Sequence, residues 1–182
     1  GDIDTPGPTY GDSASLIDLY TGGIDYSVSA FSNRTDNKDY MPVFRFKAKG
    51  LTQNLDKLVD LLKEISLHTV FTNKDRLVEL VEETKAGWDM DAFRRGHTIV
   101  MHRVLSYVSP VEAFCDAGEL SYYEFITDVA SRIRTDAEAI GAKLAAVMKK
   151  IFTRSALTLE VTASRDDWQT AKDTVSSWIT AL

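Results

Sequence analysis

"LYTGGIDYSVSAFSN", residues 19–33, passes from the end of a helix through a glycine pair into an alternating strand. In its second half the apolar residues Ile24, Tyr26, Val28 and Ala30 alternate with the polar residues Asp25, Ser27 and Ser29. This period of two predicts a strand over residues 24–31 with one covered face. Glycine is favoured just after a helix, so we interpret Gly22 and Gly23 as the C-terminal cap of the preceding helix.

Two later segments alternate in the same way. Residues 43–49 place Phe44, Phe46 and Ala48 on one face, and residues 156–163 place Leu157, Leu159, Val161 and Ala163 on one face. The polar residues 32–39 between the first two strands suit a hairpin connection. Clean alternation is typical of antiparallel sheets, so the sequence predicts a small antiparallel sheet of three strands.

Helix starts are marked by five capping boxes, in which Ser or Thr is followed three residues later by Asp or Glu. They are Thr72/Asp75, Ser109/Glu112, Ser121/Glu124, Thr135/Glu138 and Ser164/Asp167. With the apolar periodicity, they predict helices at 53–66, 73–107, 110–117, 122–133, 136–151 and 165–181, with a kink or break at Gly87 or Gly96. The fold class is therefore α+β, with the helices packed on one face of the sheet.

The composition restricts the possible partners and compartment. The chain has 182 residues, a net charge of −6 and a single cysteine. An acidic chain lacks the basic face that nucleic acids and anionic membranes require, so we expect neither as a partner. One cysteine cannot form an intramolecular disulfide, which favours the cytoplasm or an organellar matrix over secretion.

Residues that could carry chemistry do not form a recognised motif. His97 and His102 are five positions apart, whereas a helical zinc pair needs a spacing of three or four, and His68 is isolated. Cys115 is interpreted as a small packing residue on a helix. Arg94, Arg95 and Arg103 could hold an anion, but a solvated helix face is the more common role of such residues. We therefore expect no catalytic, cofactor-binding or metal-ligating residue in this chain.

Three blocks of the sequence carry a family resemblance. "TGGIDYSVSAF", "FRFKAKGLTQNLDKLVDLLKEI" and "GHTIVMHRVLSYVSPVEAFCDAGELSYYEFI" resemble successive parts of the presequence-protease branch of the insulinase/pitrilysin zinc peptidases. The similar region begins at about Tyr10 and ends in "LTLEVTASRDDW". It corresponds to the region that follows the catalytic half, specifically the third of four similar α+β domains.

The resemblance implies an organisation and a role. Residues 10–182 are expected to form one non-catalytic domain that lacks its first strand, and residues 1–9 a disordered or connecting segment. The zinc motif H-x-x-E-H of the family belongs to its first domain, so zinc is expected in the parent enzyme and no cofactor here. The domain would be a scaffold in the chamber of a zinc metalloendopeptidase that degrades short unstructured peptides.

The resemblance also implies partners, and two other functions are weighed against it. The expected partners are the remaining domains of the parent peptidase, peptide substrate in the closed chamber, and a second copy bound through an unpaired sheet edge. A free-standing protein-interaction module without enzymatic activity is the alternative. A hydrolase that uses Cys115 with His97 is disfavoured, because the sequence gives no orienting geometry for the pair.

Overall fold

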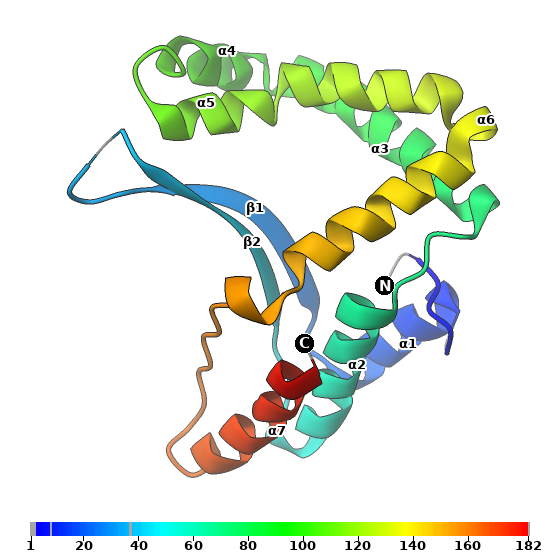
Figure 1. Cartoon of the computed structure of the whole chain (residues 1–182), viewed down its shortest axis with the longest axis vertical. Coiled ribbons are helices and arrows are strands. Elements are labelled where there is room, and N and C mark those ends of the chain that lie inside the picture. Colours follow the sequence, from blue (N-terminus) through cyan, green and yellow to red (C-terminus); the bar gives the residue numbers. More distant parts are fainter. Residues whose placement is uncertain (1–2, 8, 37, 182) are drawn as a thin grey trace. The chain divides into compact units, whose positions relative to one another are not determined.

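The computed structural model describes residues 3–7, 9–36 and 38–181. It is mostly helical with one two-stranded antiparallel sheet, which confirms the α+β class (Figure 1). The order of elements is α1 (Tyr10–Tyr20), β1 (Ile24–Ser32), β2 (Tyr40–Ala48), α2 (Leu55–His68), α3 (Lys74–Arg94), α4 (Gly96–Leu105), α5 (Pro110–Ala117), α6 (Leu120–Ile151) and α7 (Trp168–Ala181). A short 3-10 turn, η1 (Thr52–Asn54), precedes α2, and a second, η2 (Arg154–Ala156), follows α6.

The chain divides into two compact units. The first contains Gly1–Asp25, Phe46–Asn73 and Glu138–Leu182, and the second contains Tyr26–Arg45 and Lys74–Ala137. The β1–β2 hairpin and α6 each contribute residues to both units.

The passage from α1 into β1 depends on Thr21 and Gly23. Both the backbone N–H and the hydroxyl of Thr21 donate to the carbonyl of Ile17, at 2.9 and 2.8 Å. Gly23 then adopts a φ of +116°, a conformation that residues with a side chain rarely adopt. The glycine pair was predicted to cap α1, but the cap is Thr21, and the glycines form the turn that follows it.

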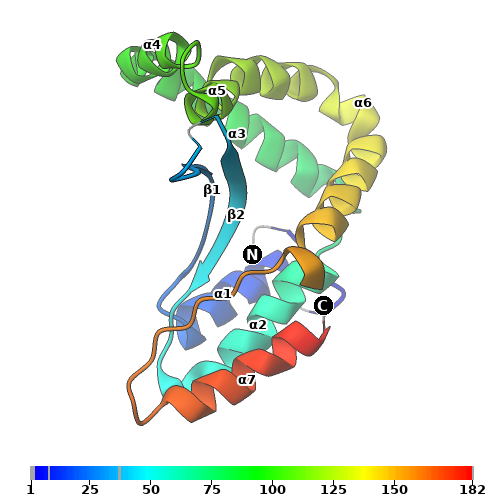
Figure 2. The ribbon, with the colours of Figure 1, turned by 60° about the vertical axis from the view of Figure 1, so that its left-hand side comes forward.

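In the first unit, α2 lies between α1 and α7 (Figure 2). The buried cluster between α2 and α7 contains Leu58, Val59, Leu62 and Trp178. The leucines and valine share the face of α2 that the sequence predicts, because they recur at helical spacing. Phe46 meets Trp178 edge to face, with ring centroids 6.4 Å apart. This contact joins one end of β2 to the helices.

The hairpin is covered by helices at only part of its apolar face. Ile24, Phe46 and Ala48 pack against the buried cluster of the first unit. Further along β1, in the second unit, the side chains of Tyr26 and Val28 remain 74% and 63% exposed. The expected covering of one sheet face is therefore incomplete: the first unit covers one end of the hairpin, and in the second unit Tyr40 of β2 contacts Phe114 of α5 with ring centroids 6.0 Å apart.

In the second unit, α3 packs against the first half of α6. Arg134 donates to Glu82 at 2.6 Å and Tyr123 donates to Asp89 at 2.7 Å, so residue numbers rise along one helix as they fall along the other. The two segments are therefore antiparallel. One stripe of α6 is buried at helical spacing and consists of Ile126, Val129, Ile133 and Ala137.

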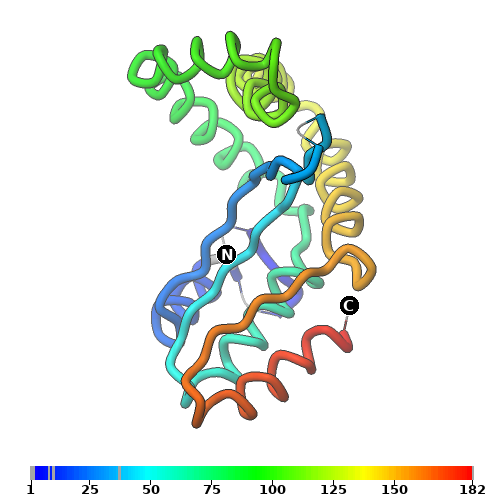
Figure 3. The backbone as a smooth tube through the Cα atoms, turned by 90° about the vertical axis from the view of Figure 1, so that its left-hand side faces the viewer, coloured from blue at the N-terminus to red at the C-terminus, as the bar shows by residue number. Residues whose placement is uncertain are grey.

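The predicted third strand at residues 156–163 is wrong. Residues 154–156 form η2, and residues 157–163 form no helix or strand. Figure 3 traces the path of this segment to α7. Alternation makes a segment able to join a sheet, but a strand also needs ladder hydrogen bonds to a neighbour. Within the described residues the sheet contains only β1 and β2.

The helix predictions are mostly confirmed, with one correction. The break at Gly96 is confirmed because α3 ends at Arg94 and α4 begins at Gly96, whereas α3 continues through Gly87. The separate helices at 122–133 and 136–151 are wrong, since α6 is continuous. Ser121 and Thr135 lie inside α6, and the Thr135 hydroxyl donates to the carbonyl of Arg132 instead of capping a helix.

Two capping predictions hold at the other helices. Ser109 caps α5, and the side chains of Ser164 and Asp167 are hydrogen-bonded just before α7. Across the part of the chain that the structure describes, no helix combines the length and the apolar character needed to cross a membrane.

Candidate functional site

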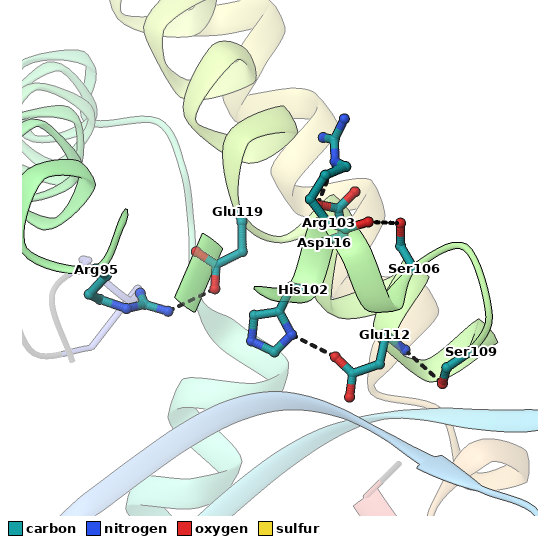
Figure 4. A network of polar contacts seen from close by, with 8 residues as sticks. All are labelled: Arg95, His102, Arg103, Ser106, Ser109, Glu112, Asp116 and Glu119. Carbon is teal, nitrogen blue, oxygen red and sulfur yellow. Dashed lines mark hydrogen bonds and ion pairs between the residues drawn. The ribbon is translucent and has the colours of Figure 1, made fainter. Parts of the chain in front are cut away.

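A cluster of polar side chains joins α4 to α5 in the second unit (Figure 4). The two helices are separated by the short turn of residues 106–109. Oγ of Ser109 accepts a hydrogen bond from the N–H of Glu112 at 3.3 Å, and Pro110 occupies the first turn of α5. Proline fixes φ near its helical value, so the cap and the proline together set where α5 begins.

His102 and Glu112 form a short polar contact between these two helices. Nδ1 of His102 lies 2.6 Å from Oε2 of Glu112, and both side chains are half-buried. Cys115 follows Glu112 by three residues on α5, and residues three apart share a helix face. One ligand atom from each of His102, Glu112 and Cys115 lies within 4.8 Å of the other two.

Two ion pairs flank this trio. Nε of Arg103 donates to Oδ1 of Asp116 at 2.9 Å, and Arg95 donates to Oε1 of Glu119 at 2.7 Å. The side chain of Glu119 is only 8% exposed. Among the described residues, no donor reaches its second oxygen, Oε2. A buried carboxylate oxygen without a donor is uncommon, so this atom calls for an explanation.

The surroundings of Cys115 hold it in the thiol form. Burial is the main cause that raises the pKa of this thiol, and the negative charges of Glu112 and Glu119 raise it further. Low-dielectric surroundings and nearby carboxylates both disfavour a thiolate. In this protonation state Cys115 is a poor nucleophile at neutral pH.

Only some of the histidines and arginines that the sequence offers as candidate site residues lie in this cluster. His68 and His97 are not part of the trio, and it is His102 that lies beside Cys115. Arg95 and Arg103 bind carboxylates of the chain itself.

The sequence analysis missed the trio because its members come from two helices. Glu112 and Cys115 lie on α5, whereas His102 is in the last turn of α4. A signal was present, since a connection of four residues between two helices brings the end of one beside the start of the next.

Comparisons with known proteins bear on identity. Residues 1–129 match the family model described as Peptidase M16c associated. Protein HypA of Clostridium perfringens is 26% identical over 176 residues, covering 96% of this chain and 18% of that protein. The mitochondrial presequence protease of Yarrowia lipolytica is 27% identical, covering 84% of this chain and 16% of that protein.

A plant relative is similar to about the same extent. Presequence protease 1, chloroplastic/mitochondrial, of Arabidopsis thaliana is 23% identical, covering 92% of this chain and 16% of that protein. The chain thus spans less than a fifth of the length of each of these relatives.

Proposed function

Because the chain belongs to the Peptidase M16c associated family, we propose that it is a non-catalytic region of a zinc metalloendopeptidase that degrades short unstructured peptides. In this proposal it is the third of four similar α+β domains. It forms part of the wall of a closed chamber and of the interface between the two halves of the enzyme. The match over residues 1–129, together with the similarity to proteins named presequence proteases, carries the proposal.

The sequence is consistent with a role without catalysis. A zinc peptidase of this class needs two histidines and a glutamate on the metal, with a further carboxylate for the attacking water. The chain has three histidines and contains neither H-x-x-E-H nor H-E-x-x-H. The catalytic zinc would therefore be held elsewhere in the parent protein.

The hairpin offers a surface for contact with the rest of the parent. Tyr26 and Val28 on β1 and Phe44 on β2 expose large apolar side chains on one face of the hairpin, where the rings of Tyr26 and Phe44 stack with centroids 6.4 Å apart. Clusters of exposed apolar residues mark interaction surfaces. In this proposal the surface binds the remaining domains of the peptidase. Peptide substrate would bind inside the chamber that the domains enclose.

Reconstitution tests the proposal. The purified chain should leave an unstructured peptide intact, and cleavage should appear when the separately produced remainder of the parent enzyme is added. Val28→Ser should weaken this reconstitution, whereas Ser27→Ala, a change at the adjacent position of the same strand, should not. Chelator-sensitive cleavage by the isolated chain, lost on His97→Ala, would overturn the proposal.

The exposed hairpin also fits the alternative, a free-standing interaction module. In that case the reading frame would encode no H-x-x-E-H half, and the surface would bind another protein or a second copy. Light scattering over a range of concentrations measures the self-association. Retention of a monomer by the wild-type chain would count against pairing through the hairpin edge.

A further inference from the structure

We propose that His102, Glu112 and Cys115 form a binding site for one Zn²⁺ ion between α4 and α5. The inference goes beyond the proposed function and rests on residues of this chain alone. The three side chains are half-buried, and one ligand atom of each lies within 4.8 Å of the others. An imidazole nitrogen, a carboxylate oxygen and a sulfur therefore lie close together between two helices.

The mixture of donors selects the metal. Magnesium and calcium prefer oxygen ligands alone, so an imidazole and a thiolate argue against both. Zinc accepts nitrogen, sulfur and oxygen together in tetrahedral geometry, and its binding would release the thiol proton of Cys115 to solvent. With zinc–ligand distances of about 2.0–2.3 Å, tetrahedral ligands lie about 3.3–3.8 Å apart. Small side-chain rotations would bring the present spacing into that range.

The backbone around the site fixes the ligands in place. Ser109 and Pro110 define the first turn of α5, which positions Glu112 and, one turn later, Cys115. His102 lies in the last turn of α4, and its carbonyl accepts the N–H of Ser106 at 2.8 Å. The three ligands are thus held on regular helices, which favours a defined metal geometry.

Glu119 is an independent observation that points to a ligand. Arg95 engages its Oε1, whereas Oε2 is buried without a donor among the described residues. In the view of Figure 4, the imidazole of His102 lies between the carboxylates of Glu119 and Glu112. Metal-bound water and metal-bound imidazoles both donate hydrogen bonds to nearby carboxylates. The charge of Glu119 acts on Cys115, so its carboxylate lies near the trio, and a rotation of the Glu119 side chain would aim Oε2 at a water in the fourth zinc position.

The inference departs from the expectation of no metal ligand in this chain. That expectation considered only ligand pairs within one helix, and the trio is assembled from two. Its ligand set also differs from the H-x-x-E-H set of the peptidases, and the role inferred for the ion is to hold α4 against α5. Reconstituted peptidase activity can therefore fail without affecting this proposal, and the reverse also holds.

Metal titration of the reduced, metal-stripped chain tests the site. Calorimetry with Zn²⁺ alone should give one ion per chain, and Co²⁺ should give the charge-transfer absorption of a thiolate ligand. Cys115→Ser should abolish that absorption, and both Cys115→Ser and His102→Gln should weaken Zn²⁺ binding at least about tenfold. Glu119→Gln should weaken Zn²⁺ binding about 10- to 100-fold while the thiolate absorption persists.

His97→Gln is the matched control, since it removes a histidine outside the trio from the same helix and should leave Zn²⁺ binding unchanged. Circular dichroism of each metal-free variant reports whether it folds. If a ligand variant does not fold, the cobalt spectrum of the wild-type chain decides alone. The proposal is overturned by absence of stoichiometric Zn²⁺ binding, by absence of the thiolate absorption, or by equal losses in His97→Gln and His102→Gln.

Discussion

The indole N–H of Trp178 on α7 donates a hydrogen bond to Oγ of Ser66 on α2, 3.0 Å away and 112 positions earlier in the chain. The Ser66 hydroxyl in turn donates to the carbonyl of Leu62 at 2.6 Å. Both residues are buried. The largest apolar side chain of the first unit's core therefore has its polar atom satisfied, and the bond fixes α7 in register on α2.

Trp178→Phe should destabilise the chain. The substitution removes the bond to Ser66 and leaves space in a core where Trp178 is only 5% exposed. We expect a loss of about 1–3 kcal/mol in the free energy of unfolding. Trp168→Phe is the matched control, because Trp168 is 45% exposed, and its effect should stay within about 0.5 kcal/mol. Urea denaturation followed by circular dichroism measures both, and equal losses would contradict the prediction.

Two Gly→Ala substitutions should have opposite signs. Gly23 has a φ of +116°, so Gly23→Ala should cost about 1–3 kcal/mol through backbone strain alone, since no atom lies within 4 Å of the added methyl. Gly87 lies inside α3, also with nothing within 4 Å, so Gly87→Ala should stabilise by up to about 1 kcal/mol. Thermal unfolding compares the two variants. A stabilised Gly23→Ala would show that the turn accepts another conformation.

Substitution by alanine should affect stability differently at Ser109 and Ser121, although both serines stand in predicted capping boxes. Ser109→Ala removes the acceptor of the Glu112 N–H and should cost about 0.5–2 kcal/mol. Ser121 lies in the first turn of α6 and is not its N-cap, so Ser121→Ala should change stability by less than about 0.5 kcal/mol. Chemical denaturation of both variants checks this. A larger loss at Ser121 would place a helix start there after all.

The thiol of Cys115 should titrate above its ordinary range. Burial raises its pKa first and the charges of Glu112 and Glu119 raise it further, so the unfolded chain loses this proton at lower pH than the folded chain. Stability should therefore fall as pH rises through the ordinary thiol pKa. The pH profile of alkylation, measured with a chelator present, should have its midpoint above that of the denatured chain.

A charge substitution provides the control for this titration. Glu112→Gln removes one of the negative charges and should lower the midpoint of the alkylation profile. Glu160→Gln changes an exposed carboxylate that is not among the charges acting on Cys115, and it should leave the midpoint unchanged. An unchanged midpoint in Glu112→Gln would mean that the charge of Glu112 does not act on the thiol.

Local sequence patterns predicted which helices and strands form better than they predicted where these elements begin and end. The face of α2, the two strands and the Ser109 cap follow from residues close in sequence, and the structure confirms them. The box at Thr135 failed because a continuous helix satisfies its own backbone groups there and leaves no orphan N–H to cap, and the box at Ser121 failed because α6 already begins at Leu120. The strand at 156–163 failed because pairing depends on a partner that alternation does not supply.

The cluster between α4 and α5 could not be predicted from spacing alone. The rule for helical metal ligands compares residues within one helix, and it correctly finds no such histidine pair. Bringing His102 beside Glu112 requires the direction of the turn at residues 106–109, which depends on packing between helices. The burial of Oε2 of Glu119 without a donor among the described residues likewise depends on the fold and cannot be predicted from the sequence.

The unbroken course of α6 limits which changes of chain length this protein can tolerate. Within the second unit its buried residues Ile126, Val129, Ile133 and Ala137 recur at helical spacing. Each residue advances a helix by about 100° and 1.5 Å, so one inserted or deleted residue between positions 129 and 133 would turn one part of this buried stripe away from the other. Related sequences should therefore vary in residue type along the middle of α6 but conserve its length there, with insertions and deletions collecting instead in segments such as 157–163 that no helix or strand constrains.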